Sequence, residues 1–154
     1  MAPPTLAELF ERERTDTVHH QGRIVRAVAH LPASDGDRVT VRFLHVGDSR
    51  PQGLKLAVDH GELEVNGRRG AVVVLWASAC PPEVELAVHG EAASMLDAWN
   101  CWSLGGVDTA WIGNAGMVTR SISAPSARTA VNMRCSDGVG IADFDDLEVE
   151  IIVH

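Results

Sequence analysis

The sequence predicts a single all-β domain, an antiparallel β-sandwich or jelly roll preceded by a short N-terminal helix. Short segments of alternating apolar and polar residues recur about every ten residues and are separated by Gly, Pro and Asn. Strands do not alternate with long helical segments, which argues against a parallel α/β sheet. We therefore treat residues 1–154 as one domain, in which residues 1–20 form an N-terminal helix and leader.

The start of the chain predicts the helix. Thr5 and Glu8 have capping-box spacing, in which each side chain accepts a hydrogen bond from a backbone N–H group of the other residue. Leu6, Leu9 and Phe10 then fall on one helical face. These features indicate a short amphipathic helix at the N-terminus.

The rest of the chain predicts strands. Segment 22–31 fits a helix or a strand, and we favour a strand because it contains several β-branched residues and Pro32 follows it. Asn66-Gly67 predicts a hairpin turn, and segment 71–77 is apolar throughout, which indicates a central strand. Further strands are expected at 39–43, 54–58, 63–65, 84–88, 95–103, 109–112, 117–123, 130–135 and 147–153.

Composition narrows the function classes. The net charge is −8, so we expect no nucleic-acid partner, because phosphate binding requires a concentrated basic face. No apolar run reaches the roughly 20 residues of a membrane span, and the acidic N-terminus is unlike a signal peptide. We expect no membrane partner and a cytoplasmic location.

The three cysteines contain no CxxC pair, which predicts neither a disulfide framework nor a thiolate zinc site.

The negative charge is concentrated at the C-terminal end. Residues 137–154 hold six acidic residues and no Lys or Arg. In segment 147–153 the odd positions are apolar, so odd residues should face the core. If this alternation extends back to residue 145, Asp145 points inward at the start of the strand, beneath a loop that contains Asp137 and Asp143.

Four carboxylates crowded without a nearby base repel one another, and a bound cation would relieve the repulsion. Calcium suits such a site because it accepts six to eight oxygen ligands in irregular geometry. Gly138 and Gly140 would let the backbone fold tightly around the ion. The segment therefore predicts a calcium site formed by Asp137, Asp143, Asp145 and Asp146.

Residues 135–153, about an eighth of the chain, loosely resemble the last loop and strand of small bacterial calcium-dependent lectins. In that family an Asp opens the loop, and paired Asn or Asp residues close it before a core strand. Asp137 and Asp143 match this motif best, whereas Asp145 and Asp146 are displaced toward the strand. The loop is also shorter, and acids replace the amides. The resemblance implies a lectin-like β-sandwich in which calcium holds sugar hydroxyls.

A second interpretation of this segment needs no ion. It describes a Ser-Asp-Gly turn followed by solvated carboxylates, some of which accept backbone N–H groups. Others would pair with distant arginines such as Arg120 or Arg134. The two interpretations predict the same sequence and differ in where the carboxylate oxygens point.

Tryptophans mark a second candidate site. Their rings stack on the C–H faces of sugars, so Trp99 and Trp111, with Asn100 and Asn114 to bind hydroxyls, predict a site for a carbohydrate or another small ligand. Core packing is the alternative, because the chain has no Tyr and only three Phe to fill a sandwich.

The leading hypothesis is a non-enzymatic β-sandwich module that binds calcium and, through or beside it, a carbohydrate-like ligand. The sequence assigns no catalytic residue. One alternative is a small cytosolic enzyme, such as a cyclase, isomerase or hydrolase, with an Asp and His acid–base pair in a sandwich or barrel pocket. Another is a structural module that forms homo-oligomers, because β-sandwiches usually expose edge strands.

Overall fold

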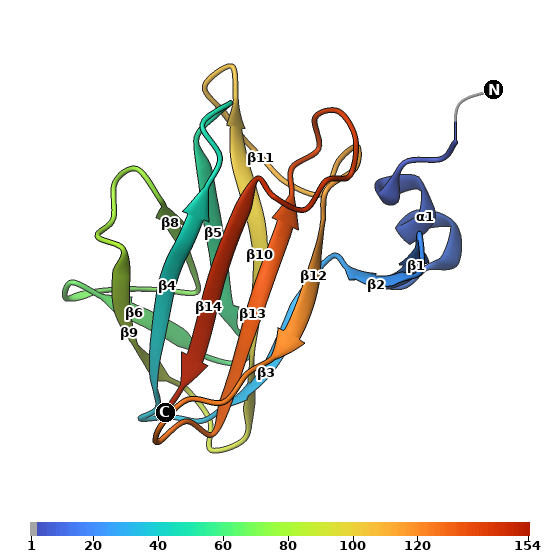
Figure 1. The fold of residues 1–154 in the computed structure, drawn as a ribbon. Coiled ribbons are helices and arrows are strands. Elements are labelled where there is room, and N and C mark those ends of the chain that lie inside the picture. The colour runs from blue at the N-terminus through green and yellow to red at the C-terminus, as the bar shows by residue number, and fades with distance from the viewer. Residues whose placement is uncertain (1–2) are drawn as a thin grey trace.

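A computed structural model describes residues 3–154 and shows a β-sandwich, which confirms the predicted fold class (Figure 1). Its elements are α1 (Leu6–Glu13), β1 (Thr17–His20), β2 (Arg23–Arg26), β3 (Ala29–Ala33), β4 (Arg38–Val46), β5 (Gln52–Val58), β6 (Glu62–Val65), β7 (Arg68–Gly70), β8 (Val72–Trp76), β9 (Glu83–His89), β10 (Ser94–Leu104), β11 (Val107–Thr109), β12 (Gly116–Ser121), β13 (Thr129–Ser136) and β14 (Leu147–Val153). Within the described residues, no helix has the length and apolar character to cross a membrane.

The strands form two antiparallel sheets. The larger has the order β1-β2-β12-β13-β14-β4-β9-β6-β7, and the smaller has the order β11-β10-β5-β8, with β3 also pairing with β10. Strands β13 and β14 follow one another in the sequence, whereas β4, the other neighbour of β14 in the sheet, lies far from it in the sequence (Figure 1). Their ends therefore bring the residues after β4 next to those before β14.

The core follows from period-two alternation. Val39 and Val41 of β4 and Val149 and Ile151 of β14 are fully buried, as predicted. They pack with apolar residues of β5, β9 and β10 in one large cluster. The cysteines are free, and burial raises the pKa of the Cys101 thiol to about 12.

The structure corrects three details of the sequence prediction. Segment 22–31 is extended, but it divides into β2 and the start of β3. Segment 71–77 is wrong as a central strand, because β8 is the edge strand of the smaller sheet and Val72 is exposed. Segment 109–112 is largely wrong as a strand, because β11 ends at Thr109. The hairpin at Asn66-Gly67 is confirmed by the pairing of β6 with β7.

The N-terminal residues form a separate packing unit on the larger sheet. The capping box of Thr5 and Glu8 is confirmed at the start of α1. β1 pairs with β2, and β2 joins the sheet through one registered pair, Arg26 with Met117 of β12. A small second cluster of buried residues fills the space between this unit and the rest of the chain, and its members are Leu6, Val18, Val25 and Phe144.

Candidate cation and ligand site

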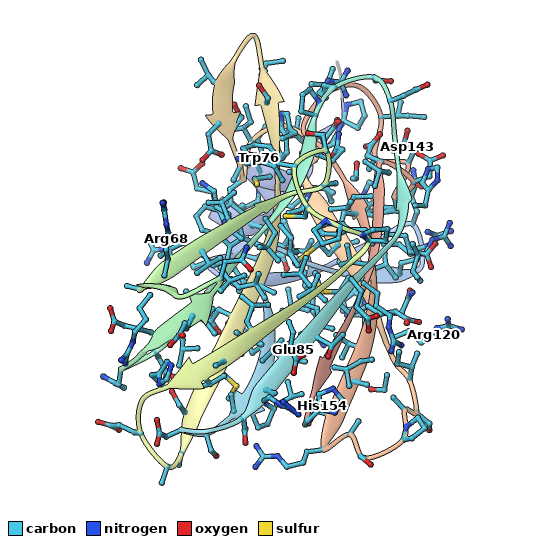
Figure 2. The ribbon with its side chains drawn as sticks, turned by 90° about the vertical axis from the view of Figure 1, so that its left-hand side faces the viewer. Arg68, Trp76, Glu85, Arg120, Asp143 and His154 are labelled. Carbon is cyan, nitrogen blue, oxygen red and sulfur yellow. The ribbon has the colours of Figure 1, made fainter. Side chains whose placement is uncertain are left out.

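The acidic segment lies at one end of the sandwich. It connects β13 to β14, and the loop from β4 to β5 lies beside it, because the Gly47 N–H donates to the Asp146 carbonyl at 2.7 Å. Figure 2 places Asp143 toward this end, and His154, which follows the last strand, toward the other. The predicted acidic residues therefore lie where several strands of both sheets end.

Asp137 is buried and is neutralised by the protein itself. Its side chain has no exposed surface, and its Oδ2 accepts from Arg50 Nη1 at 2.5 Å and from Gln52 Nε2 at 2.9 Å. Its Oδ1 accepts from the Val139 N–H at 3.0 Å. Both oxygens thus have donors, one of them a cation.

This arrangement corrects part of the sequence argument. The expectation that the four acids have no base nearby is wrong for Asp137, which pairs with Arg50. Arg120 and Arg134, named as distant partners, instead line a pocket on the outer face of the larger sheet with Asn132 and Glu148. Figure 2 shows Arg120 well away from Asp143.

The other three acids converge. One carboxylate oxygen from each of Asp143, Asp145 and Asp146 lies within 4.8 Å of the others. None of the three has an ion pair with a basic side chain of residues 3–154. The Asp137 N–H donates to Asp146 Oδ2 at 2.8 Å and carries no charge. Three negative groups therefore share a small volume.

Asp145 does not point inward as predicted. It is exposed, and Phe144 is the buried residue of this stretch. The inward phase of β14 holds from Leu147 onward, but Phe144 has a φ of +54°, which turns the backbone before the strand begins. The result is that Asp143 and Asp145 both face solvent on either side of a buried ring.

Crowding changes the titration of Asp146. Burial, followed by the charges of Asp137 and Asp143 and a hydrogen bond with Asp143, raises the pKa of its carboxyl to about 6. A folded pKa above the ordinary value means that this group stabilises the fold below pH 3.8, and that the stabilisation is lost as the pH rises through about 6. At neutral pH the ionised form is thus costly without a positive partner.

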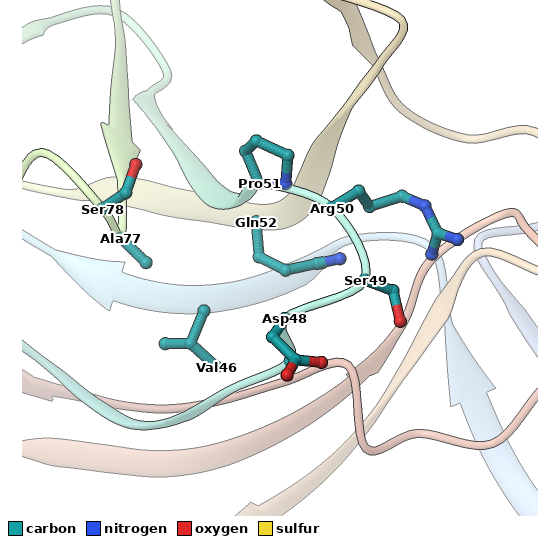
Figure 3. A pocket seen from close by; sticks show the side chains of 9 residues that line it. Val46, Asp48, Ser49, Arg50, Pro51, Gln52, Ala77 and Ser78 are labelled. Carbon is teal, nitrogen blue, oxygen red and sulfur yellow. The ribbon is translucent and has the colours of Figure 1, made fainter.

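A pocket of about 480 Å³ adjoins this end of the sandwich (Figure 3). The loop from β4 to β5 supplies Asp48, Ser49, Arg50 and Gln52, and the turn after β8 supplies Ser78. Figure 3 shows Asp48 and Gln52 on one stretch of chain, across from Ala77 and Ser78. The lining offers hydroxyl, carboxylate and amide groups to a polar ligand.

Gln52 is an unusual part of this lining. It is buried, its Nε2 is held by Asp137, and its Oε1 has no hydrogen-bond partner within the described residues. A buried acceptor without a donor is costly, and a buried water is the usual partner of such an atom. The sequence analysis missed Asp48, Ser49 and Gln52. The turn residues Gly47 to Pro51 after a predicted strand were the available signal.

The structure does not bring Trp99 and Asn100 to one ligand. They are neighbours on β10 and point to opposite faces. Asn100 is buried and donates to the Ser136 carbonyl across the sandwich at 2.9 Å, so it faces the interior. Trp99 is buried, belongs to the main core cluster as the core-packing alternative expects, and stacks on Trp111 with ring centroids 4.9 Å apart.

Trp111 and Asn114 have structural contacts of their own. Trp111 is about half exposed, and its Nε1 donates to the Ala27 carbonyl at 3.0 Å. The Asn114 amide donates to the Gly140 carbonyl at 2.8 Å, which attaches its loop to the acidic segment. Asn114 therefore contacts the acidic segment directly, and Asn100 contacts Ser136 at its start.

Comparisons with known proteins give distant structural likenesses. The chain is similar to a Chromobacterium violaceum lectin, CV2L, solved in complex with alpha-methyl-fucoside, with a TM-score of 0.41, 16% identity, and coverage of 82% of this chain and 94% of the lectin. It is also similar to a Ralstonia solanacearum high-affinity mannose-binding lectin, with a TM-score of 0.41, 14% identity, and coverage of 87% and 96%. No family model and no curated protein matches the sequence. At these TM-scores the likenesses establish neither a shared family nor a shared ligand.

Proposed function

We propose that the chain is a non-enzymatic binding module that holds a calcium ion with Asp143, Asp145 and Asp146. Through or beside that ion it binds a carbohydrate-like ligand. The observation that carries the proposal is the convergence of the three carboxylates within 4.8 Å without a basic partner among the described residues. A cation among them would replace mutual repulsion with attraction.

The donor set favours calcium over other common ions. Three carboxylates supply up to six hard oxygens, which suits the six to eight ligands of calcium, and two of them are exposed and free to adjust. Magnesium demands a stricter octahedral geometry. Zinc and copper prefer His or Cys ligands, and the nearby Cys135 is fully buried, with a thiol whose pKa is raised by that burial.

The adjacent pocket is the reason for proposing a hydroxyl-rich ligand. Calcium that keeps open coordination positions accepts oxygen ligands from outside the protein, and paired hydroxyls supply two at once. Asp48, Ser49 and Ser78 line the neighbouring pocket and can hydrogen-bond further hydroxyls. Gly47, whose N–H contacts the Asp146 carbonyl, brings this lining against the acidic residues.

The test is isothermal titration of the EDTA-treated full chain with calcium, in wild type and in Asp145→Asn. Asp108→Asn is the matched control, because Asp108 pairs with Lys55 outside the acidic segment. We expect saturable binding in wild type and in the control, and weakened binding in Asp145→Asn. A glycan array probed with and without calcium then identifies the sugar. Absence of calcium binding by wild type contradicts the proposal.

A further inference from the structure

Phe144 is placed where it can control the geometry of the acidic residues. It lies between Asp143 and Asp145 in the sequence, yet it is 3% exposed while both neighbours are exposed. Its φ of +54° is a left-handed conformation that disfavours residues with a Cβ atom. Burial of the ring must therefore hold this turn, which directs the two flanking carboxylates outward.

The N-terminal unit provides the surroundings of this ring. The other fully enclosed members of its cluster are Leu6 of α1, Val18 of β1 and Val25 of β2, so none of them comes from the main sandwich core. The guanidinium carbon of Arg23 lies 5.8 Å from the ring centroid, within cation–π range. Three successive N-terminal elements thus share one cluster with Phe144, and Val118 of β12 and Ala142 pack against it.

A second connection runs through hydrogen bonds. The Ala7 N–H donates to the Gly113 carbonyl at 2.9 Å, and the Leu6 N–H donates to Asn114 Oδ1 at 3.2 Å. The Asn114 amide then donates to the Gly140 carbonyl at 2.8 Å. The start of α1 is therefore linked through Asn114 to the loop that carries Asp143.

The packing between these parts leaves little room. A Cβ added at Gly116 would lie 2.6 Å from Val25 Cγ1 and 3.2 Å from Leu6 Cδ1, so the N-terminal unit sits directly on the start of β12. In the larger sheet this unit is otherwise attached by the single registered pair of Arg26 with Met117. Its side-chain packing is thus directed largely at the end of the sandwich that holds the acidic residues.

We propose that the N-terminal unit, residues 6–26, positions the calcium ligands of the proposed site, and that Phe144 is the positioning residue through which it acts. This inference rests on the proposed calcium binding. If the docked unit holds the ligand geometry, docking and calcium binding stabilise each other, because coupling between two sites is reciprocal. Loosening the unit should then weaken calcium binding without touching a carboxylate.

The test uses full-length variants outside the acidic segment. Val18→Ala and Val25→Ala remove methyl groups from the Phe144 cluster, and Val88→Ala removes the same atoms from the main core as the matched control. Arg23→Gln, at an exposed position, is a milder variant that keeps the cluster intact. Two quantities are measured for each: the calcium Kd by isothermal titration, and amide hydrogen exchange of residues 137–146 in EDTA.

We expect Val18→Ala and Val25→Ala to raise the calcium Kd at least about fivefold and to speed exchange in residues 137–146. Arg23→Gln should change both in the same direction by less, and Val88→Ala should change neither. Phe144→Leu should retain tighter binding than Phe144→Ala, because it keeps an apolar side chain in the cluster. In wild type, calcium should also slow amide exchange in α1, β1 and β2.

The two proposals fail in different ways. If wild type does not bind calcium, the proposed function is wrong, and the exchange data in EDTA still test whether the N-terminal unit positions residues 137–146. Exchange of residues 137–146 that is unchanged in Val18→Ala and Val25→Ala overturns the positioning role. An unchanged calcium Kd in both variants, with wild-type binding intact, overturns it as well.

Discussion

Carboxylates at different places in this molecule are neutralised differently. Asp137 is fully buried and receives the Arg50 guanidinium, and Asp16 and Asp97 each contact one ring nitrogen of His30 at 2.6 Å. Asp143, Asp145 and Asp146 lie close together, with one carboxylate oxygen of each within 4.8 Å of the others, yet no basic side chain in the described part of the chain pairs with them. A carboxylate that pairs with a basic side chain of the protein has a structural role. Where it has none, we propose an external cation as the partner.

The largest effect is expected from removing the internal cation of Asp137. Arg50→Met should destabilise the fold by about 3 kcal/mol or more, because it leaves a charge buried without its partner. Urea denaturation measures this loss. Arg42→Met is the control, since Arg42 is itself 45% exposed and its pairs with Glu83 and Glu150 should be worth at most about 1 kcal/mol. Equal small losses in both variants would mean that Asp137 does not depend on Arg50.

A smaller effect with the opposite sign is expected at the acidic residues that have no base. In EDTA, Asp145→Asn should leave the fold as stable as wild type or more stable, because it removes one of three repelling charges. In calcium the same change should lower affinity at least tenfold, or about 1.4 kcal/mol. Denaturation in EDTA and calcium titration give the two numbers. Destabilisation in EDTA would show that Asp145 has a structural partner.

The smallest effect is expected at His30. Contacts with Asp16 first and Asp97 second raise the pKa of this imidazole above 6.5. The bridge therefore stabilises the fold fully below pH 6.5, and the stabilisation is lost as the pH rises through the raised pKa. The side chain is 41% exposed, so the contribution should not exceed about 1 kcal/mol.

The variant that tests this bridge is His30→Asn, measured as melting temperature against pH. Its profile should be flatter than that of wild type above pH 6.5. Asp16, whose pKa His30 lowers, adds stability above pH 3.8 that is lost on acidification, so the variant should also lose stability near neutral pH. His19→Asn, at an exposed histidine, should keep the wild-type profile. Identical profiles for His30→Asn and wild type would exclude the bridge.

The sequence predicted the sandwich and its last strand well, because alternation in segment 147–153 directly reflects burial. The alternation does not extend back to Asp145, because the backbone of Phe144 has a left-handed conformation and turns the chain there. The pairing of Asp137 with Arg50 joins residues 87 positions apart, and local pattern carries no signal for such a contact. One signal was overlooked. In Asp143-Phe144-Asp145 an aromatic residue is flanked in the sequence by two acidic residues, which indicates that its ring is buried between two exposed neighbours.

The most direct test of the proposed calcium site is a calcium-specific anomalous difference map from crystals grown with calcium. We predict one peak about 2.4 Å from carboxylate oxygens of Asp143, Asp145 and Asp146, with Asp137 still paired to Arg50. A map with no peak among these oxygens at saturating calcium, and with the three carboxylates turned apart into water, would contradict the account.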